Sequence, residues 1–111
     1  DGSAPIHTAV AAVLTGARLG VEAELECPGA ETGDAIEEAC TEEFVADGLG
    51  EALAALAADD TFADALGRGL VDQVTMVKEA ELEKYLAAVG DEAAARDEFT
   101  DWEKGFYLPY L

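Results

Sequence analysis

The longest run of residues without a helix breaker covers positions 70–89. Apolar side chains recur there at steps of three and four residues, the spacing of one helical face, while most charged residues fall on the other side. The stripe and its flanks consist of Leu70, Val71, Val74, Val77, Glu81, Leu82, Tyr85, Leu86 and Val89. Because Gly69 and Gly90 enclose the run and glycine readily adopts the conformations that end helices, we predict a central helix between them, on which the other elements pack.

A second helical pattern begins after Ser3, a good N-cap, and Pro5, which a first helical turn tolerates. Its apolar stripe consists of Ile6, Val10, Val13, Leu14 and Ala17. Positions 6–17 carry no charged side chain, and a helix so poor in charge is normally buried, so we predict a buried helix that ends at Gly20. His7 is interpreted as a packed, hydrogen-bonded residue and not as an acid–base or ligand group, because no carboxylate motif accompanies it.

Helical periodicity is lost between positions 21 and 47, where acidic residues are mixed with Pro28, Gly29 and Gly33. The acidic side chains are those of Glu22, Glu24, Glu26, Glu31, Asp34, Glu37, Glu38, Glu42 and Glu43. They do not follow the spacing of a calcium-binding loop, so we predict a long, solvated acidic loop. Residues 21–26 alternate between apolar and acidic, which fits either an edge strand or an extended loop.

Two short helices are expected before the central one. The first is capped by Asp47 or Gly48, with Glu51 placed for an arrangement like a capping box. Its apolar face consists of Leu49, Leu53 and Leu56. The sequence Asp-Asp-Thr at positions 59–61 ends this helix and caps the second, whose apolar face consists of Phe62 and Leu66.

The last part of the sequence is rich in aromatic residues. After a polar, Ala-rich segment at 91–98, Thr100 and Glu103 repeat the Thr-x-x-Glu capping box. Aromatic residues follow at steps of four, namely Trp102, Phe106 and Tyr110. We interpret them as packing residues and not as a ligand cage, and we predict a short helix, limited by Pro109, that covers the first and central helices.

These patterns together predict a mainly α fold of four to five helices with a long acidic loop. Residues 1–111 are expected to form a single unit, because the chain is too short for two cores. The core is expected to be thin: Leu, Ile, Val and Phe supply only 26 of the 111 residues, and the hydrophobic fraction of 50% depends largely on Ala.

The formal charge of −19, from 25 acidic and 6 basic residues, restricts the choice of partners. Since no Lys or Arg lies between Arg18 and Arg68, the chain offers no basic patch for phosphates, and nucleic acid is excluded as an expected partner. Acidic residues spread over Ala-rich helices fit the solvated coat of a protein in a salt-rich, haloarchaeal-like cytoplasm, where screening relieves self-repulsion. A surface that captures a basic partner is the alternative interpretation.

The residues by themselves show no chemistry, so we identify no catalytic, cofactor-binding or metal-ligating residue. Cys27 and Cys40 form no CxxC motif, and with one histidine in the chain a zinc site lacks ligands. We expect free thiols, with a disulfide as the alternative. Neither a targeting signal nor an apolar stretch long enough to span a bilayer is present, so we expect no membrane partner and a cytoplasmic location.

The order of these patterns resembles part of the glutamine synthetase family. Residues 1–4, Asp-Gly-Ser-Ala, lead into an Ala-rich helix that closes at Leu-Gly-Val-Glu, much as the family's Asp-Gly-Ser-Ala-Asn-Pro leads into an Ala/Leu helix. After an irregular segment with Gly33 and Asp34, residues 49–59 are similar to the family's Leu-Glu-Glu-Ala-Leu-x-Ala-Leu-x-x-Asp. The ending, Thr-Asp-Trp-Glu at 100–103 with a following Tyr-Leu, resembles branches that include γ-glutamylamine and γ-glutamylpolyamine synthetases.

The resemblance covers essentially the whole chain, but only the C-terminal helical portion of the family's α+β catalytic domain. One departure is that the family's Asn-Pro-Tyr is Pro5-Ile6-His7 here. For a complete chain, the resemblance implies an ATP-dependent ligase that activates the glutamate γ-carboxylate as an acyl phosphate for attack by ammonia or an amine, with Mg²⁺ or Mn²⁺ stabilising charge. The family's metal, nucleotide and ammonium-site residues lie upstream of this segment, which would therefore be an inactive scaffold when isolated. The implied partners are the rest of the catalytic domain and, for the complete enzyme, further copies of itself.

Three hypotheses follow from the sequence. The chain is the C-terminal part of such a ligase, a stand-alone non-catalytic remnant of one, or an unrelated acidic helical module that binds a protein partner. The open reading frame upstream of Asp1 distinguishes them, since only the first hypothesis requires metal and phosphate motifs there.

Overall fold

The computed structural model describes residues 4–30, 33, 45–90 and 99–110 of the chain. Five α-helices and one short 3₁₀ helix account for most of them. The elements are α1 (Ile6–Glu22), α2 (Leu49–Ala58), α3 (Asp60–Leu66), α4 (Arg68–Val89), α5 (Asp101–Tyr107) and η1 (Leu108–Tyr110). The part that the structure describes contains no strand, and this confirms the predicted mainly α fold with five helices.

The first helix is longer than predicted, because α1 continues through Gly20 and ends at Glu22. Its last turn is closed by Arg18, whose Nη1 donates to Glu22 Oε1 at 2.8 Å, and such a pair four residues apart supports a helix end. One glycine costs a helix only about 1 kcal/mol relative to alanine, too little to stop it here. The edge-strand interpretation of residues 21–26 is therefore wrong, and Glu24, at φ 52°, instead makes the turn that leaves the helix.

An irregular chain follows α1, as expected of the acidic loop. Residues 25–30 have no regular secondary structure and are exposed. Most of the predicted loop, including the acidic residues at 31, 34, 37, 38, 42 and 43, lies outside the described residues. The same holds for the polar segment at 91–98 and for the proposed N-cap Ser3, whereas Pro5 occupies the N-cap position of α1.

The caps of α2, α3 and α5 agree with the sequence. Gly48 is the N-cap of α2, and the backbone N–H of Asp47 donates to Glu51 Oε2 at 2.8 Å. Asp59 ends α2 and caps α3, since its Oδ1 accepts from the N–H of Phe62 at 2.8 Å. Thr100 forms the complete capping box of α5. Each of these caps depends on residues within four positions of one another, so it could be predicted from the sequence alone.

The central helix begins two residues earlier than predicted. Gly67, with φ at 107°, is the N-cap of α4, and the helix starts at Arg68 instead of after Gly69. The guanidinium of Arg68 reaches back over the turn, donating from Nε to Asp64 Oδ1 at 2.5 Å and from Nη2 to Asp60 Oδ1 at 2.7 Å. Gly90, at φ 93°, ends the helix as predicted.

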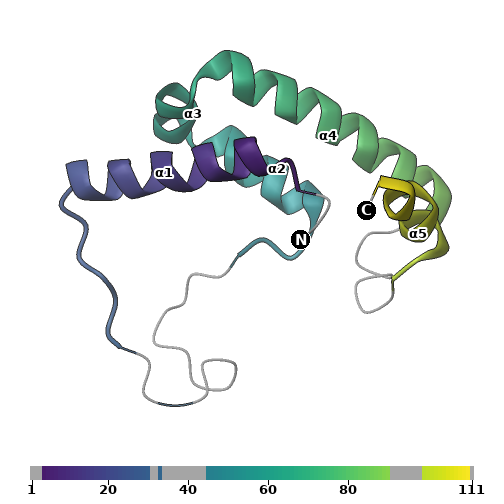
Figure 1. Cartoon of the computed structure of the whole chain (residues 1–111), viewed down its shortest axis with the longest axis horizontal. Helices are drawn as coiled ribbons and strands as arrows, with labels where there is room; N and C mark the ends of the chain where they lie inside the picture. Colours follow the sequence, from purple (N-terminus) through teal and green to yellow (C-terminus); the bar gives the residue numbers. More distant parts are fainter. Residues whose placement is uncertain (1–3, 31–32, 34–44, 91–98, 111) are drawn as a thin grey trace.

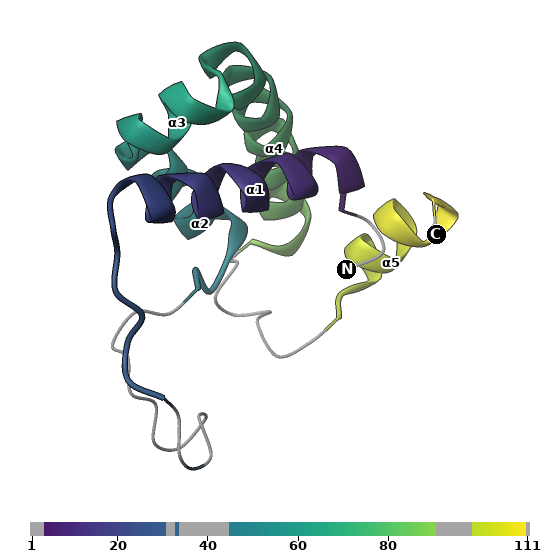
Figure 2. The same ribbon diagram turned by 60° about the vertical axis from the view of Figure 1, so that its left-hand side comes forward.

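The helices pack as a thin layer around α3 and α4. In Figure 1, α2 and α3 lie beside the first half of α4, and α5 lies at its other end. Helix α1 packs on α3 and not on α4, so the prediction that every element packs on the central helix is wrong for α1. In the view of Figure 2, α1 crosses in front of α2 and α4. Among the described residues, the buried apolar side chains are those of Ala63 and Val71, which confirms a thin core.

Candidate functional site

Helix α1 carries five exposed large apolar side chains, more than any other helix that the structure describes. We call this surface the outer face of α1, and its members are Ile6 (65% exposed), Val10 (49%), Val13 (71%), Leu14 (64%) and Val21 (78%). The first four belong to the stripe predicted from the sequence, so the stripe itself is correct. The prediction that it is buried is wrong, because these four side chains are between 49% and 71% exposed.

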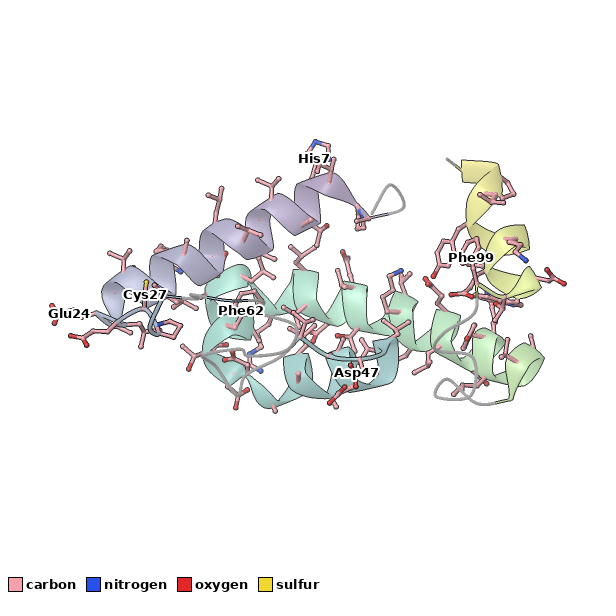
Figure 3. All side chains as sticks on the ribbon, turned by 90° about the horizontal axis from the view of Figure 1, so that it is seen from below. His7, Glu24, Cys27, Asp47, Phe62 and Phe99 are labelled. Carbon is pink, nitrogen blue, oxygen red and sulfur yellow. The ribbon has the colours of Figure 1, made fainter. Side chains whose placement is uncertain are left out.

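The opposite side of α1 is the one that packs on α3. It presents half-buried small residues, Thr8, Ala12 and Thr15, together with one larger residue, Leu19. Phe62 of α3 (labelled in Figure 3) lies beside Gly16, so that a Cβ added at Gly16 would meet its ring at 4.0 Å. Small residues let the two helices approach closely but bury little apolar area. Helix α1 is therefore held by its less apolar side, and its more apolar side remains uncovered.

His7 lies near the start of α1 and is exposed, pointing away from the helical body in Figure 3. The prediction of a packed histidine is therefore wrong, for the same reason that the stripe is exposed.

A second candidate site is the junction between α4 and α5, where a charged residue is buried. Glu81 of α4 is only 8% exposed, although it is a carboxylate on the apolar stripe. Its Oε2 accepts from Lys78 Nζ at 2.8 Å, and its Oε1 accepts a short hydrogen bond from the Tyr107 hydroxyl of α5. A buried carboxylate needs such partners to offset its lost hydration. The helical spacing of Glu81 with its apolar neighbours was the only sequence signal for this burial.

Aromatic rings complete the α4–α5 junction. Trp102 stacks on Phe106 with ring centroids 4.7 Å apart and meets Tyr85 of α4 edge-on at 5.3 Å. Tyr107 stands edge-on to Trp102 at 6.3 Å. This confirms that the aromatic residues fold back as a packed helix, but α5 covers α4 alone and not α1. The side chain of Tyr110 is outside the described part of the structure.

The Tyr107 hydroxyl makes this junction sensitive to alkaline pH. Burial, reinforced by the hydrogen bond to Glu81 and the charge of Glu103, raises the pKa of Tyr107 above its ordinary value of 10.0. A pKa that is higher in the folded state means that the neutral hydroxyl stabilises folding below the unfolded pKa, and that this contribution falls as pH rises beyond it.

Replacing Tyr107 by phenylalanine is expected to lower the melting temperature near neutral pH, because Glu81 Oε1 loses its donor inside the junction. The difference between the native chain and Tyr107→Phe should shrink as pH rises above about 10, where the unfolded chain releases the tyrosine proton. Thermal unfolding of both chains between about pH 8 and pH 11 measures it. A difference that stays constant over this range would contradict the proposed hydrogen bond.

A shallow cleft of about 320 Å³ lies between α2, α3 and α4. Apolar side chains of Leu56, Val71 and Met76 line it, and Asp60, Asp72 and Glu79 supply acidic groups. Arg68, also at the cleft, is already paired with Asp60 and Asp64, and its hydrogen bond holds the pKa of Asp64 below its ordinary value. The cleft therefore presents acid without a free cation to hold an anionic ligand.

No group of three or more His, Cys, Asp or Glu side chains suited to a metal ion occurs within residues 4–30, 45–90 and 99–110. The absence of catalytic, cofactor-binding and metal-ligating residues stays a prediction. Cys27 is a free, exposed thiol on the segment after α1, and its predicted alternative partner Cys40 lies outside the described residues. None of the helices that the structure describes is long and apolar enough to cross a bilayer.

Comparison with known protein families gives a match over most of the chain. The model of a family described as glutamine synthetase, catalytic domain, matches residues 1–97. Searches of curated proteins and of solved structures gave no match. The matched residues contain α1 to α4 and end before α5, so the α4–α5 junction combines a helix inside the matched region with one outside it.

Proposed function

The chain belongs to the glutamine synthetase catalytic-domain family, and from this premise we propose that it is the C-terminal helical scaffold of a ligase that joins ammonia or an amine to the glutamate γ-carboxylate. The observation that carries the proposal is the family match over residues 1–97, which contains four of the five helices. The mainly α architecture agrees with a scaffold segment of such a domain.

The family chemistry requires ATP and Mg²⁺ or Mn²⁺, and the described residues do not fit either group. Four basic residues are already paired with carboxylates of this chain, namely Arg18, Arg68, Lys78 and Lys104. A triphosphate that used these four side chains would have to break their ion pairs, and it would approach a strongly acidic chain. We therefore derive no step of the reaction through this chain and propose that other residues of the complete enzyme hold nucleotide and metal.

Finer assignments extend the same proposal. The ending Thr-Asp-Trp-Glu at 100–103 supports a branch that forms γ-glutamylamines, because it resembles the corresponding ending of those members. The charge of −19 supports a salt-rich cytoplasm. Partnership with the rest of the catalytic domain follows from the scaffold role, and assembly of the complete enzyme into a homo-oligomer is proposed by analogy with the family.

The alternative is a stand-alone acidic module that binds a basic protein partner. It is supported by the acidic groups at the α2–α3–α4 cleft, where Met76 adds an exposed apolar contact. A reading frame that starts close to Asp1 would favour this alternative, whereas metal and phosphate motifs upstream would favour the ligase.

The purified 111-residue chain is expected to neither hydrolyse ATP nor form glutamine above the rate of a chain-free control. The reason is that four of its six basic side chains are engaged in ion pairs and no phosphate-binding loop is present in its sequence. Phosphate release and γ-glutamyl hydroxamate formation at molar KCl, with glutamate and Mg²⁺ or Mn²⁺, measure this.

The polypeptide encoded by the whole open reading frame serves as the positive control and is expected to show ATP-dependent amide formation. Turnover by the 111-residue chain that persists through further purification would contradict the scaffold role. Absence of ligase activity in the complete polypeptide would contradict the proposed function itself.

A further inference from the structure

The outer face of α1 has the composition of a buried surface. Its side chains are Ile, Val and Leu, three of the residue types most often found in protein interiors, yet they are between 49% and 78% exposed. Covering these side chains would remove apolar surface from water, which favours association with another apolar surface. An exposed contiguous apolar face of this kind marks an interaction surface.

Charge is excluded from this face in a chain that is otherwise densely charged. Positions 6–17 hold no Asp, Glu, Lys or Arg, although the whole chain has 31 such residues, 25 acidic and 6 basic. In a protein with a charge of −19, a helix face that is exposed to solvent would be expected to carry acidic residues. The charged residues of α1 begin only at Arg18, which pairs with Glu22 near the end of the helix.

The packing of α1 within this chain also leaves room for a partner. Helix α1 packs on α3, where Gly16 lies near Phe62, and makes no packing contact with α2, α4 or α5. Apart from Leu19, its large apolar side chains lie on the outer face, where they can interdigitate with an apposed apolar surface. At about 1.5 Å per residue, the stretch from Ile6 to Val21 offers a ridge on the order of 22 Å long.

We propose that the outer face of α1 is the surface by which this chain docks on the rest of the catalytic domain within the same polypeptide. The inference rests on the proposed function. A second copy of the chain is a poorer occupant, because pairing two chains of charge −19 brings their acidic coats together. The α5 aromatics need no outside partner, since they are already packed on Tyr85 of α4.

The test measures whether the outer face is covered in the complete polypeptide. In a background of Cys27→Ser and Cys40→Ser, Val13→Cys places a thiol on the face, and Glu83→Cys places one on the exposed side of α4 as a matched control. Each variant is made both in the 111-residue chain and in the polypeptide encoded by the complete reading frame. The rate of labelling by a maleimide is measured at molar KCl.

In the isolated chain both thiols are expected to react at similar rates. In the complete polypeptide, Val13→Cys is expected to react at least about tenfold more slowly, because labelling then requires local opening, while Glu83→Cys stays unchanged. Ala17→Cys, a smaller change on the same exposed side, keeps the test valid if Val13→Cys perturbs folding.

Equal labelling of Val13→Cys in both polypeptides would overturn the inference. If this occurs while the complete polypeptide forms γ-glutamyl amides, docking through α1 fails and the ligase function stands. Protection that is already present in the isolated chain and grows with its concentration would identify a second copy as the occupant, which also overturns the inference. A reading frame that supplies no further catalytic domain would overturn both the docking and the proposed function.

Discussion

Replacing Trp102 by alanine is expected to lower the free energy of unfolding by about 3 kcal/mol, the lower end of the range for deleting a large packed aromatic. The lower end applies because Trp102 is only half-buried. Its indole contacts Phe106, Tyr107 and Tyr85, so its removal takes away the stacking partner of α5 and the edge contact to α4 together. Urea unfolding of both chains at molar KCl, followed by circular dichroism, measures the change.

Phe99→Ala is the matched control for this experiment. Phe99 lies just before α5 but is 55% exposed, so its removal should cost only about 0.5 kcal/mol. The single tryptophan gives a second readout, since iodide should quench its fluorescence less in the folded chain than in the urea-unfolded chain. If Trp102→Ala costs no more than Phe99→Ala, or if quenching is the same in both states, α5 does not pack on α4 in solution.

Features that depend on neighbouring residues could be predicted from the sequence. The cap of α3 at Asp59, the capping box at Thr100 and the helix end at Gly90 each involve contacts within one turn. The period of the apolar stripes was predictable for the same reason, because it depends only on helix geometry. The existence and order of the helices therefore followed from the residues alone.

The direction in which a stripe faces could not be predicted in this way. The pattern of Ile6, Val10 and Val13 shows that one side of α1 is apolar, but whether that side is covered depends on which surfaces are available to pack against it. In the described structure α1 packs on α3, and it does so through the side that carries Gly16, which lies near Phe62. The rule that an uncharged helix is buried fails if the covering surface belongs to another part of the protein.

Glu81 shows a second limit of sequence reasoning. Its place on the apolar stripe of α4 was visible, but its burial depends on Tyr107, which lies 26 residues further along the chain, and on Lys78 one turn before it. Such a long-range hydrogen bond has no local signature. The start of α4 at Arg68 is similar, because it follows from ion pairs made with α3 across the Gly67 turn.

Helix content is expected to rise strongly when KCl is raised from about 0.05 M to about 2 M, because the screening length falls well below the spacing of surface charges. A net charge of −19 creates repulsion in every compact state of the chain. The described core opposes it weakly, since Ala63 and Val71 are its buried apolar residues. The exposed ion pairs, such as that of Arg18 with Glu22, contribute only about 0 to 1 kcal/mol each.

Circular dichroism at 222 nm and the melting temperature, each followed against KCl concentration, measure this dependence. A triple variant, Asp72→Asn, Glu79→Gln and Glu83→Gln, removes three exposed carboxylates from α4 and should reach the same helicity at lower salt. Because concentrated salt can also strengthen apolar burial, sucrose serves as a neutral comparison, and it should be less effective than KCl if repulsion is the cause. If helicity is independent of salt, or if the triple variant needs as much salt as the native chain, charge repulsion does not limit folding and the interpretation of the acidic coat as an adaptation to high salt is wrong.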